Sequence, residues 1–111
     1  MAEFQIDGDR IAYTHHPPGR DGARTFVLFN AMTQPHQAWD PVVAMLTREG
    51  HGTLGYDLRG QPGSTAAPGL TLDVARVVED ARALLAHVAP ARPVLVGLSI
   101  GGLFGIQPAG P

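Results

Sequence analysis

Ser99 lies at the centre of a short motif whose residue types and spacing suit nucleophilic catalysis. Residues 97–101 read GLSIG and follow an apolar run, so they match the pattern G-x-S-x-G at the end of a predicted strand and the start of a predicted helix. The glycines two positions before and after the serine allow a sharp turn that exposes its hydroxyl. The same turn directs backbone N–H groups toward negative charge developing on a reacting carbonyl. We therefore interpret Ser99 as a candidate nucleophile.

Two other interpretations of this motif are open. In a glycine-rich turn without catalytic function, Ser99 would cap the helix that follows it. The turn would otherwise be a weak nucleotide-binding loop, but such loops carry G-x-G-x-x-G or end in G-K-[ST], and neither pattern is present. The strand–turn–helix context favours the nucleophile.

Three apolar runs predict strands buried on both faces. They are TFVLFN at residues 25–30, GTLGYD at residues 52–57 and PVLVGLS at residues 93–99. Before them, EFQIDGDRIAY predicts two short strands around an Asp7-Gly8 turn, a strong hairpin signal. The segment HHPPGRDGAR, residues 15–24, is rich in proline and glycine and predicts a loop.

Two segments between these strands predict helices. In AWDPVVAMLTREG, Asp40 can cap the helix, Pro41 suits its first turn and Gly50 ends it. From Thr71 to Val88 apolar residues recur with a helical period, which predicts an amphipathic helix. Its polar face comprises Asp73, Arg76, Glu79, Asp80 and Arg82.

The order of these elements predicts an α/β fold. A hairpin is followed by strand, helix, strand, helix, strand and a further helix, and this alternation produces a mostly parallel sheet with crossover helices on its faces. Ligand sites in such sheets lie beyond the carboxyl ends of the strands. Asn30, Asp57 and Ser99 are all predicted at that edge.

Two further segments join the serine motif in a recognisable order. FNAMTQPHQAW, residues 29–39, follows one predicted strand, and YDLRGQPGS, residues 56–64, follows the next. With the serine turn they resemble the N-terminal half of the α/β-hydrolase family, which has an H-G-like turn followed by Trp, a D-x-R-G-x-G-x-S-like loop and a nucleophile elbow. The resemblance covers nearly all 111 residues, and it implies one partial α/β-hydrolase domain over residues 1–111, truncated after the elbow.

The resemblance also implies a reaction and its residues. Ser99 corresponds to the nucleophile of a serine hydrolase that acts on an ester, a lactone or a similar acyl substrate. The backbone N–H groups of Met32 and Ile100 correspond to the oxyanion-hole donors, and we expect their nitrogens to converge on one point about 3 Å from each. No cofactor and no metal is implied.

The sequence departs from the family pattern at three places. Asn30-Ala31 replaces the usual His-Gly, a variation that resembles the enol-lactonase branch of the family. Pro62 stands where the loop after Asp57 usually has glycine. The last four residues, PAGP, are poor helix formers where a long helix is expected.

The triad partners of Ser99 are missing from this sequence. No His, Asp or Glu follows Ser99, whereas the family places first its acid and then its histidine after the serine. Only His36 is predicted at the same edge as Ser99, and we interpret it as a solvated loop residue near the substrate entrance. The remaining histidines are predicted at the opposite edge: His15, His16, His51 and His87. The chain by itself is therefore expected to be nearly inactive.

Three other residues near the motifs receive structural interpretations. We interpret Asp57 as a turn-stabilising residue rather than a catalytic acid. Arg59 is expected to pair with local carboxylates or carbonyls. Trp39 is expected to anchor its helix by packing rather than to form a substrate platform.

The strand that leads to Ser99 is the last one predicted, so one of its sides forms an open apolar edge. The alternative to an enzyme is therefore a non-catalytic fragment or interaction module that keeps the front half of the fold and self-associates through this edge.

Composition excludes several other classes of function. The formal net charge of −2 provides no electrostatic basis for binding nucleic acid or an anionic membrane. The absence of cysteine excludes disulfides, thiolate zinc sites and a cysteine nucleophile. Residues 1–10 lack a signal-peptide pattern, and the longest apolar stretch, residues 94–106, is too short and glycine-rich to span a bilayer, so we expect a cytoplasmic location.

Overall fold

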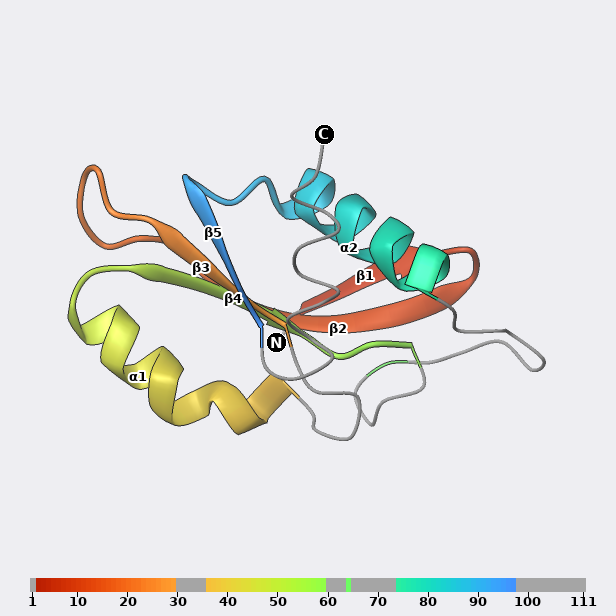
Figure 1. The fold of residues 1–111 in the computed structure, drawn as a ribbon, viewed down its shortest axis with the longest axis horizontal. Coiled ribbons are helices and arrows are strands. Elements are labelled where there is room, and N and C mark those ends of the chain that lie inside the picture. Colours follow the sequence, from red (N-terminus) through yellow and green to blue (C-terminus); the bar gives the residue numbers. More distant parts are fainter. Residues whose placement is uncertain (1, 30–35, 60–63, 65–73, 98–111) are drawn as a thin grey trace.

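A five-stranded sheet with helices on both faces forms the fold (Figure 1). The computed structural model describes residues 2–29, 36–59, 64 and 74–97. The strands are β1 (Ala2–Ile6), β2 (Asp9–His16), β3 (Thr25–Phe29), β4 (Gly52–Tyr56) and β5 (Pro93–Gly97). The helices are the short 3₁₀ turn η1 (His36–Trp39), α1 (Asp40–Arg48) and α2 (Val74–Val88).

The strands lie in the order β1-β2-β4-β3-β5. β3 runs parallel to both β4 and β5, while the hairpin β1–β2 adds antiparallel strands beside β4. The predicted α/β class, with a parallel sheet and crossover helices, is confirmed for the described residues.

The hairpin turn follows the residues that predicted it. Asp7 and Gly8 have φ values of 49° and 81°, and two successive positive φ angles are the mark of the turn that matches strand twist. β2 continues through His15 and His16, which were predicted to lie in a loop, and that prediction is wrong. The extension occurs because β2 pairs with β4 from Tyr13 to His16, a partner that the hairpin motif does not reveal.

The main core lies between the sheet and α2. Val27, Phe29, Leu54 and Tyr56 alternate along β3 and β4, so their side chains share one face of the sheet. On that face they pack against three buried residues of α2, namely Val77, Ala81 and Leu84. Asp80 was assigned to the solvent face of this helix, and this is wrong, because only 3% of its surface is exposed.

Helix α1 covers the opposite face of the sheet and none of its own residues is fully buried. Trp39 is its N-cap and no side-chain hydrogen bond caps the helix, so the prediction that Asp40 is the cap is wrong by one residue. Pro41 lies in the first turn as expected. Gly50 ends the helix with a φ of 85°, and His51 N–H closes the end on the Leu46 carbonyl at 3.0 Å.

β5 is an edge strand among the residues that the structure describes, where it pairs with β3 alone. Val94, Leu95 and Val96 are only half-buried, so the prediction of a fully buried strand is wrong. The apolar run alone does not show how many neighbours a strand has. Within the same described ranges, no helix has the length and apolar character needed to cross a membrane.

Candidate active-site edge of the sheet

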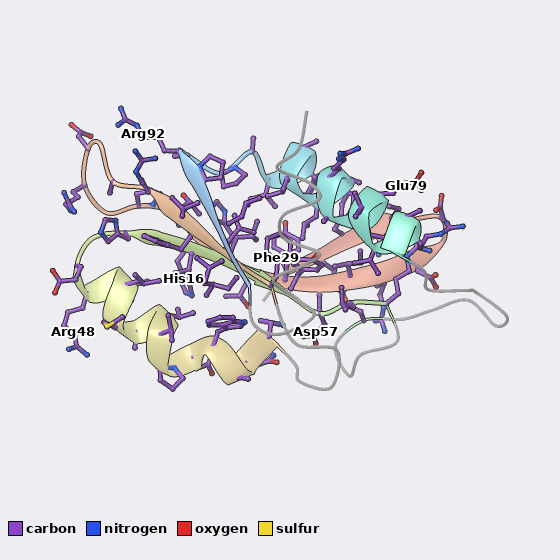
Figure 2. All side chains as sticks on the ribbon, in the orientation of Figure 1. His16, Phe29, Arg48, Asp57, Glu79 and Arg92 are labelled. Atoms are coloured by element: carbon purple, nitrogen blue, oxygen red, sulfur yellow. The ribbon has the colours of Figure 1, made fainter. Side chains whose placement is uncertain are left out.

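The carboxyl ends of β3 and β5 lie side by side. In the parallel pairing of these strands Phe29 lies opposite Gly97, and both are the last residues of their strands. Neighbouring strands are about 4.8 Å apart, so the segments that follow Phe29 and Gly97 begin at adjacent positions. Figure 2 shows Phe29 and Asp57 toward one end of the strands and His16 toward the other.

The three residues predicted to perform the chemistry lie outside the described residues. Ser99 and Ile100 follow β5, and Met32 follows β3. Their roles and the expected convergence of the Met32 and Ile100 nitrogens therefore stay predictions.

Asp57 is buried just beyond β4 and holds two hydrogen bonds on one carboxylate oxygen. Its Oδ1 accepts the backbone N–H of His36 at 2.6 Å and lies 2.8 Å from the Nδ1 of the same residue. Only 1% of Asp57 is exposed. This arrangement matches the turn-stabilising interpretation, since the carboxylate fixes the start of η1.

Ser64 holds the backbone of Asp57 in place. Its hydroxyl donates to the Asp57 carbonyl at 2.8 Å and accepts the Ala12 N–H at 2.9 Å. The Asp57 N–H in turn donates to the Ala12 carbonyl at 3.0 Å. Ser64 is the last residue of the YDLRGQPGS segment, but no local sequence pattern predicts these hydrogen bonds.

His36 is buried, with 5% of its surface exposed, so its interpretation as a solvated loop residue is wrong. A carboxylate can only accept, so the Nδ1 of His36 carries the hydrogen toward Asp57. Its Nε2 lies 3.0 Å from the Thr14 hydroxyl oxygen. Asp57 is 21 residues away in sequence, and no local pattern reports such a partner.

The His36 ring lies against β4, two strands away from β5, the strand that precedes Ser99 in the sequence. Both ring nitrogens have partners, and the ring packs beside Gly55 of β4. β3 separates β4 from β5, which amounts to two strand spacings or roughly 10 Å.

The other histidines lie away from this edge or over the hairpin. His16 pairs with Thr53 near the start of β4, and His51 directly precedes that strand, as predicted. His87 lies in the last turn of α2, and its ring lies over the hairpin, 4.8 Å from the Phe4 ring and 6.3 Å from the Tyr13 ring. The hairpin extends beyond the parallel strands, so α2 packs over it along part of its length (Figure 1).

Arg59 forms a buried ion-pair network on the α2 face. Its NH2 donates to Asp80 at 2.9 Å and to Asp7 at 3.2 Å, and its NH1 donates to Asp9 at 3.3 Å. Its Nε lies 2.9 Å from the second Asp80 oxygen as an ion-pair contact. The prediction of carboxylate partners is confirmed, but these partners come from the hairpin and α2 rather than from nearby sequence.

The pKa values of both Asp80 and Arg59 are raised in this network. Burial raises the pKa of the Asp80 carboxyl, and the hydrogen bonds and charge of Arg59 oppose part of that rise. Burial alone would lower the pKa of Arg59, but its bonds to Asp7 and Asp80 outweigh this effect and raise it. The guanidinium is therefore a permanent charge that offsets the cost of burying Asp9 and Asp80.

Trp39 is half-buried at the start of α1 and lines a cavity of about 30 Å³ between α1 and the sheet. Leu28, Val43 and Thr53 also line it. This position agrees with the expected packing role. Within the part of the chain that the structure describes, no group of three His, Asp or Glu side chains is arranged to hold a metal ion.

The strand order, the turn at Asp57 and the place of the serine motif after β5 in the sequence all agree with the α/β-hydrolase fold. The sequence profile described as "Alpha/beta hydrolase family" matches residues 26–111. The chain belongs to the alpha/beta hydrolase family.

Individual relatives agree with this assignment. The chain is 37% identical over 97 residues to a protein named "Putative carbamate hydrolase RutD" from Variovorax paradoxus (strain S110), covering 87% of this chain and 36% of that protein. It is 28% identical to the enol-lactonase from Burkholderia xenovorans LB400, with a TM-score of 0.81, covering 95% of this chain and 40% of the enol-lactonase.

A third comparison concerns the fold alone. A structure reported with carboxylesterases of the Thaumarchaeon Nitrososphaera gargenis has a TM-score of 0.87 at 22% identity, covering 97% of this chain and 40% of that one. The chain thus spans between 36% and 40% of the length of these three proteins.

Proposed function

We propose that the chain is the N-terminal portion of a serine hydrolase in which Ser99 is the nucleophile. The observation that carries this proposal is the register of β3 and β5, in which Phe29 lies opposite Gly97. Ser99 is two residues beyond Gly97 and Met32 is three residues beyond Phe29. Adjacent strand ends support this proposal, because they allow a nucleophile and an oxyanion donor to come within the short separation that one carbonyl group requires.

In the proposed reaction the Ser99 hydroxyl oxygen attacks a carbonyl carbon, and the Met32 and Ile100 N–H groups bind the resulting oxyanion. The general base and its acid are supplied by sequence beyond residue 111, in the family order. The substrate class is an ester, a lactone or a similar acyl compound. Carbamates and enol-lactones, which appear in the names of two relatives, both present a carbonyl carbon bonded to a heteroatom leaving group.

The 111-residue chain alone is expected to hydrolyse an activated ester such as p-nitrophenyl acetate at the background rate. A serine hydroxyl without a base is a weak nucleophile at neutral pH, and His36 is bonded to Asp57 instead. The assay compares the chain with its Ser99→Ala and His36→Ala variants, and the three rates should be equal. Triad enzymes that lose the base keep only about 10³–10⁴-fold over water, and much of the substrate pocket is expected to lie beyond this chain. A burst of product that disappears in both variants would instead establish a working Ser99–His36 pair.

We propose as a second candidate an interaction module that associates through β5. It is favoured by the half-buried Val94 and Val96 on a strand that, among the described residues, pairs only with β3. Unpaired strand edges template pairing with another chain.

If the chain is such an interaction module, it should form dimers at micromolar concentrations. Sedimentation velocity should show that the dimer fraction rises with concentration. Val96→Lys should shift the protein toward the monomer, because a lysine on an edge strand disfavours pairing with another edge. Met45→Lys is the matched control, since Met45 is 53% exposed on α1, away from the edge, and should leave the dimer intact. A monomer at all concentrations would remove the interaction module as a candidate.

A further inference from the structure

One carboxylate oxygen of Asp57 contacts two nitrogen atoms of His36. It accepts the backbone N–H at 2.6 Å, and the ring Nδ1 lies 2.8 Å away. Hydrogen bonds to an ionised acceptor are stronger than neutral ones, and two of them to one residue fix both its backbone and its side chain. His36 is therefore held in one place and one orientation.

Further hydrogen bonds hold both members of the Asp57–His36 pair. The Asp57 backbone bonds in both directions, with its N–H on Ala12 and its carbonyl on Ser64. On the other side of His36, its Nε2 lies 3.0 Å from the Thr14 hydroxyl. The pair thus connects η1 to β2 and to the end of β4.

A buried pair of this kind adds little net free energy of stabilisation to a protein core. Burying a carboxylate and an imidazole carries a desolvation penalty, and apolar side chains of similar volume are often equally or more stabilising at buried ion-pair positions. Asp57 is 1% exposed and His36 is 5% exposed. What the pair supplies beyond stability is a fixed position for the residue at which η1 begins.

We propose that Asp57 is a positioning residue of the hydrolytic site, an inference that rests on the proposed role of Met32. Phe29 is fixed by its pairing with Gly97, and His36 is fixed by Asp57. Met32 lies between these two anchors, three residues after the first and four before the second. Anchoring both ends of a connecting segment removes conformational freedom from it before the reaction begins. The Met32 N–H donor would then lose less conformational entropy when it binds the oxyanion. Asp57 acts through His36 and touches no substrate.

Amide hydrogen exchange of the 111-residue chain, followed by mass spectrometry, tests this inference without using catalysis. Asp57→Ala and His36→Ala should each raise the exchange rate of the peptide 30–36 by about tenfold or more, as expected for the loss of charge-assisted hydrogen bonds. A peptide from α2, residues 76–88, should change much less. His36→Asn should restore much of the protection, because its side-chain amide can donate to Asp57 in place of Nδ1.

Two substitutions at Gly55 test the position of His36 while the Asp57 carboxylate stays in place. A Cβ added at Gly55 would lie 3.5 Å from the His36 Cβ, an ordinary contact, so Gly55→Ala should leave exchange at residues 30–36 unchanged. Gly55→Val adds methyl groups that push His36 away while Asp57 stays intact, and it should raise that exchange.

Two results would overturn the inference. One is unchanged exchange at residues 30–36 in Asp57→Ala and His36→Ala. The other is an equal rise in the α2 peptide, since that marks Asp57 and His36 as an ordinary core pair. Ser99→Ala should leave every exchange rate unchanged, so a failure of the proposed catalytic role of Ser99 is seen separately in activity measurements.

Discussion

Replacing Arg59 by methionine is expected to lower the free energy of unfolding by about 3–5 kcal/mol, the usual cost of removing one partner from a buried ion pair. The Arg59 side chain is 1% exposed, and the Asp9 and Asp80 side chains that it neutralises are 7% and 5% exposed. Methionine fills a similar volume but leaves these carboxylates buried without their cation. Since domains of this kind are stable by only about 5–15 kcal/mol, the loss should be visible as a large fall in the urea midpoint.

Arg76→Met is the matched control for this experiment. Arg76 also lies beside Asp7, at 3.4 Å, but its side chain is 36% exposed and solvent screens the interaction. Its replacement should cost about 1 kcal/mol or less. If Arg59→Met does not fold, Arg59→Lys keeps the charge without the planar fork and should give an intermediate midpoint. A loss in Arg59→Met no larger than that in Arg76→Met would show that the network does not stabilise the fold.

Ser99→Ala is expected to lower kcat by about 10³- to 10⁶-fold in a complete domain built on this chain, as loss of the nucleophile does in other triad enzymes. Such a domain can be assembled by joining residues 1–111 to the part of the Burkholderia xenovorans enol-lactonase that lies beyond the aligned region, which covers 40% of that protein. On the proposed function, the joined portion would supply the acid and the histidine, and this chain would supply Ser99, Met32 and Ile100. Hydrolysis of p-nitrophenyl acetate measures the effect.

Thr47→Ala is the control for the joined protein, because Thr47 is exposed on α1 and should leave kcat unchanged. Circular dichroism and gel filtration establish that both variants fold like the parent. An active parent whose rate is unchanged by Ser99→Ala would exclude Ser99 as the nucleophile. That outcome would leave the Asp57–His36 exchange measurements unaffected.

Residues close together in sequence determined the elements of this protein. Asp7-Gly8 predicted the hairpin because few other pairs accept two positive φ angles, and the structure confirms it. Gly50 predicted the end of α1 for the same conformational reason. The apolar runs at residues 25–30 and 52–57 predicted buried strands, and the order of strands and helices then predicted the α/β class. These signals are local, so a single sequence contains them in full.

The tertiary structure alone decided how polar groups within those elements are paired. Asp80 lies on the polar side of a helical pattern, yet it is buried because Arg59 reaches it from 21 residues away. His36 has the sequence context of a solvated loop residue and is buried because Asp57 and Thr14 bind its ring. Periodicity reports which residues share a face, whereas burial depends on what packs against that face, and only chain folding brings those distant residues together.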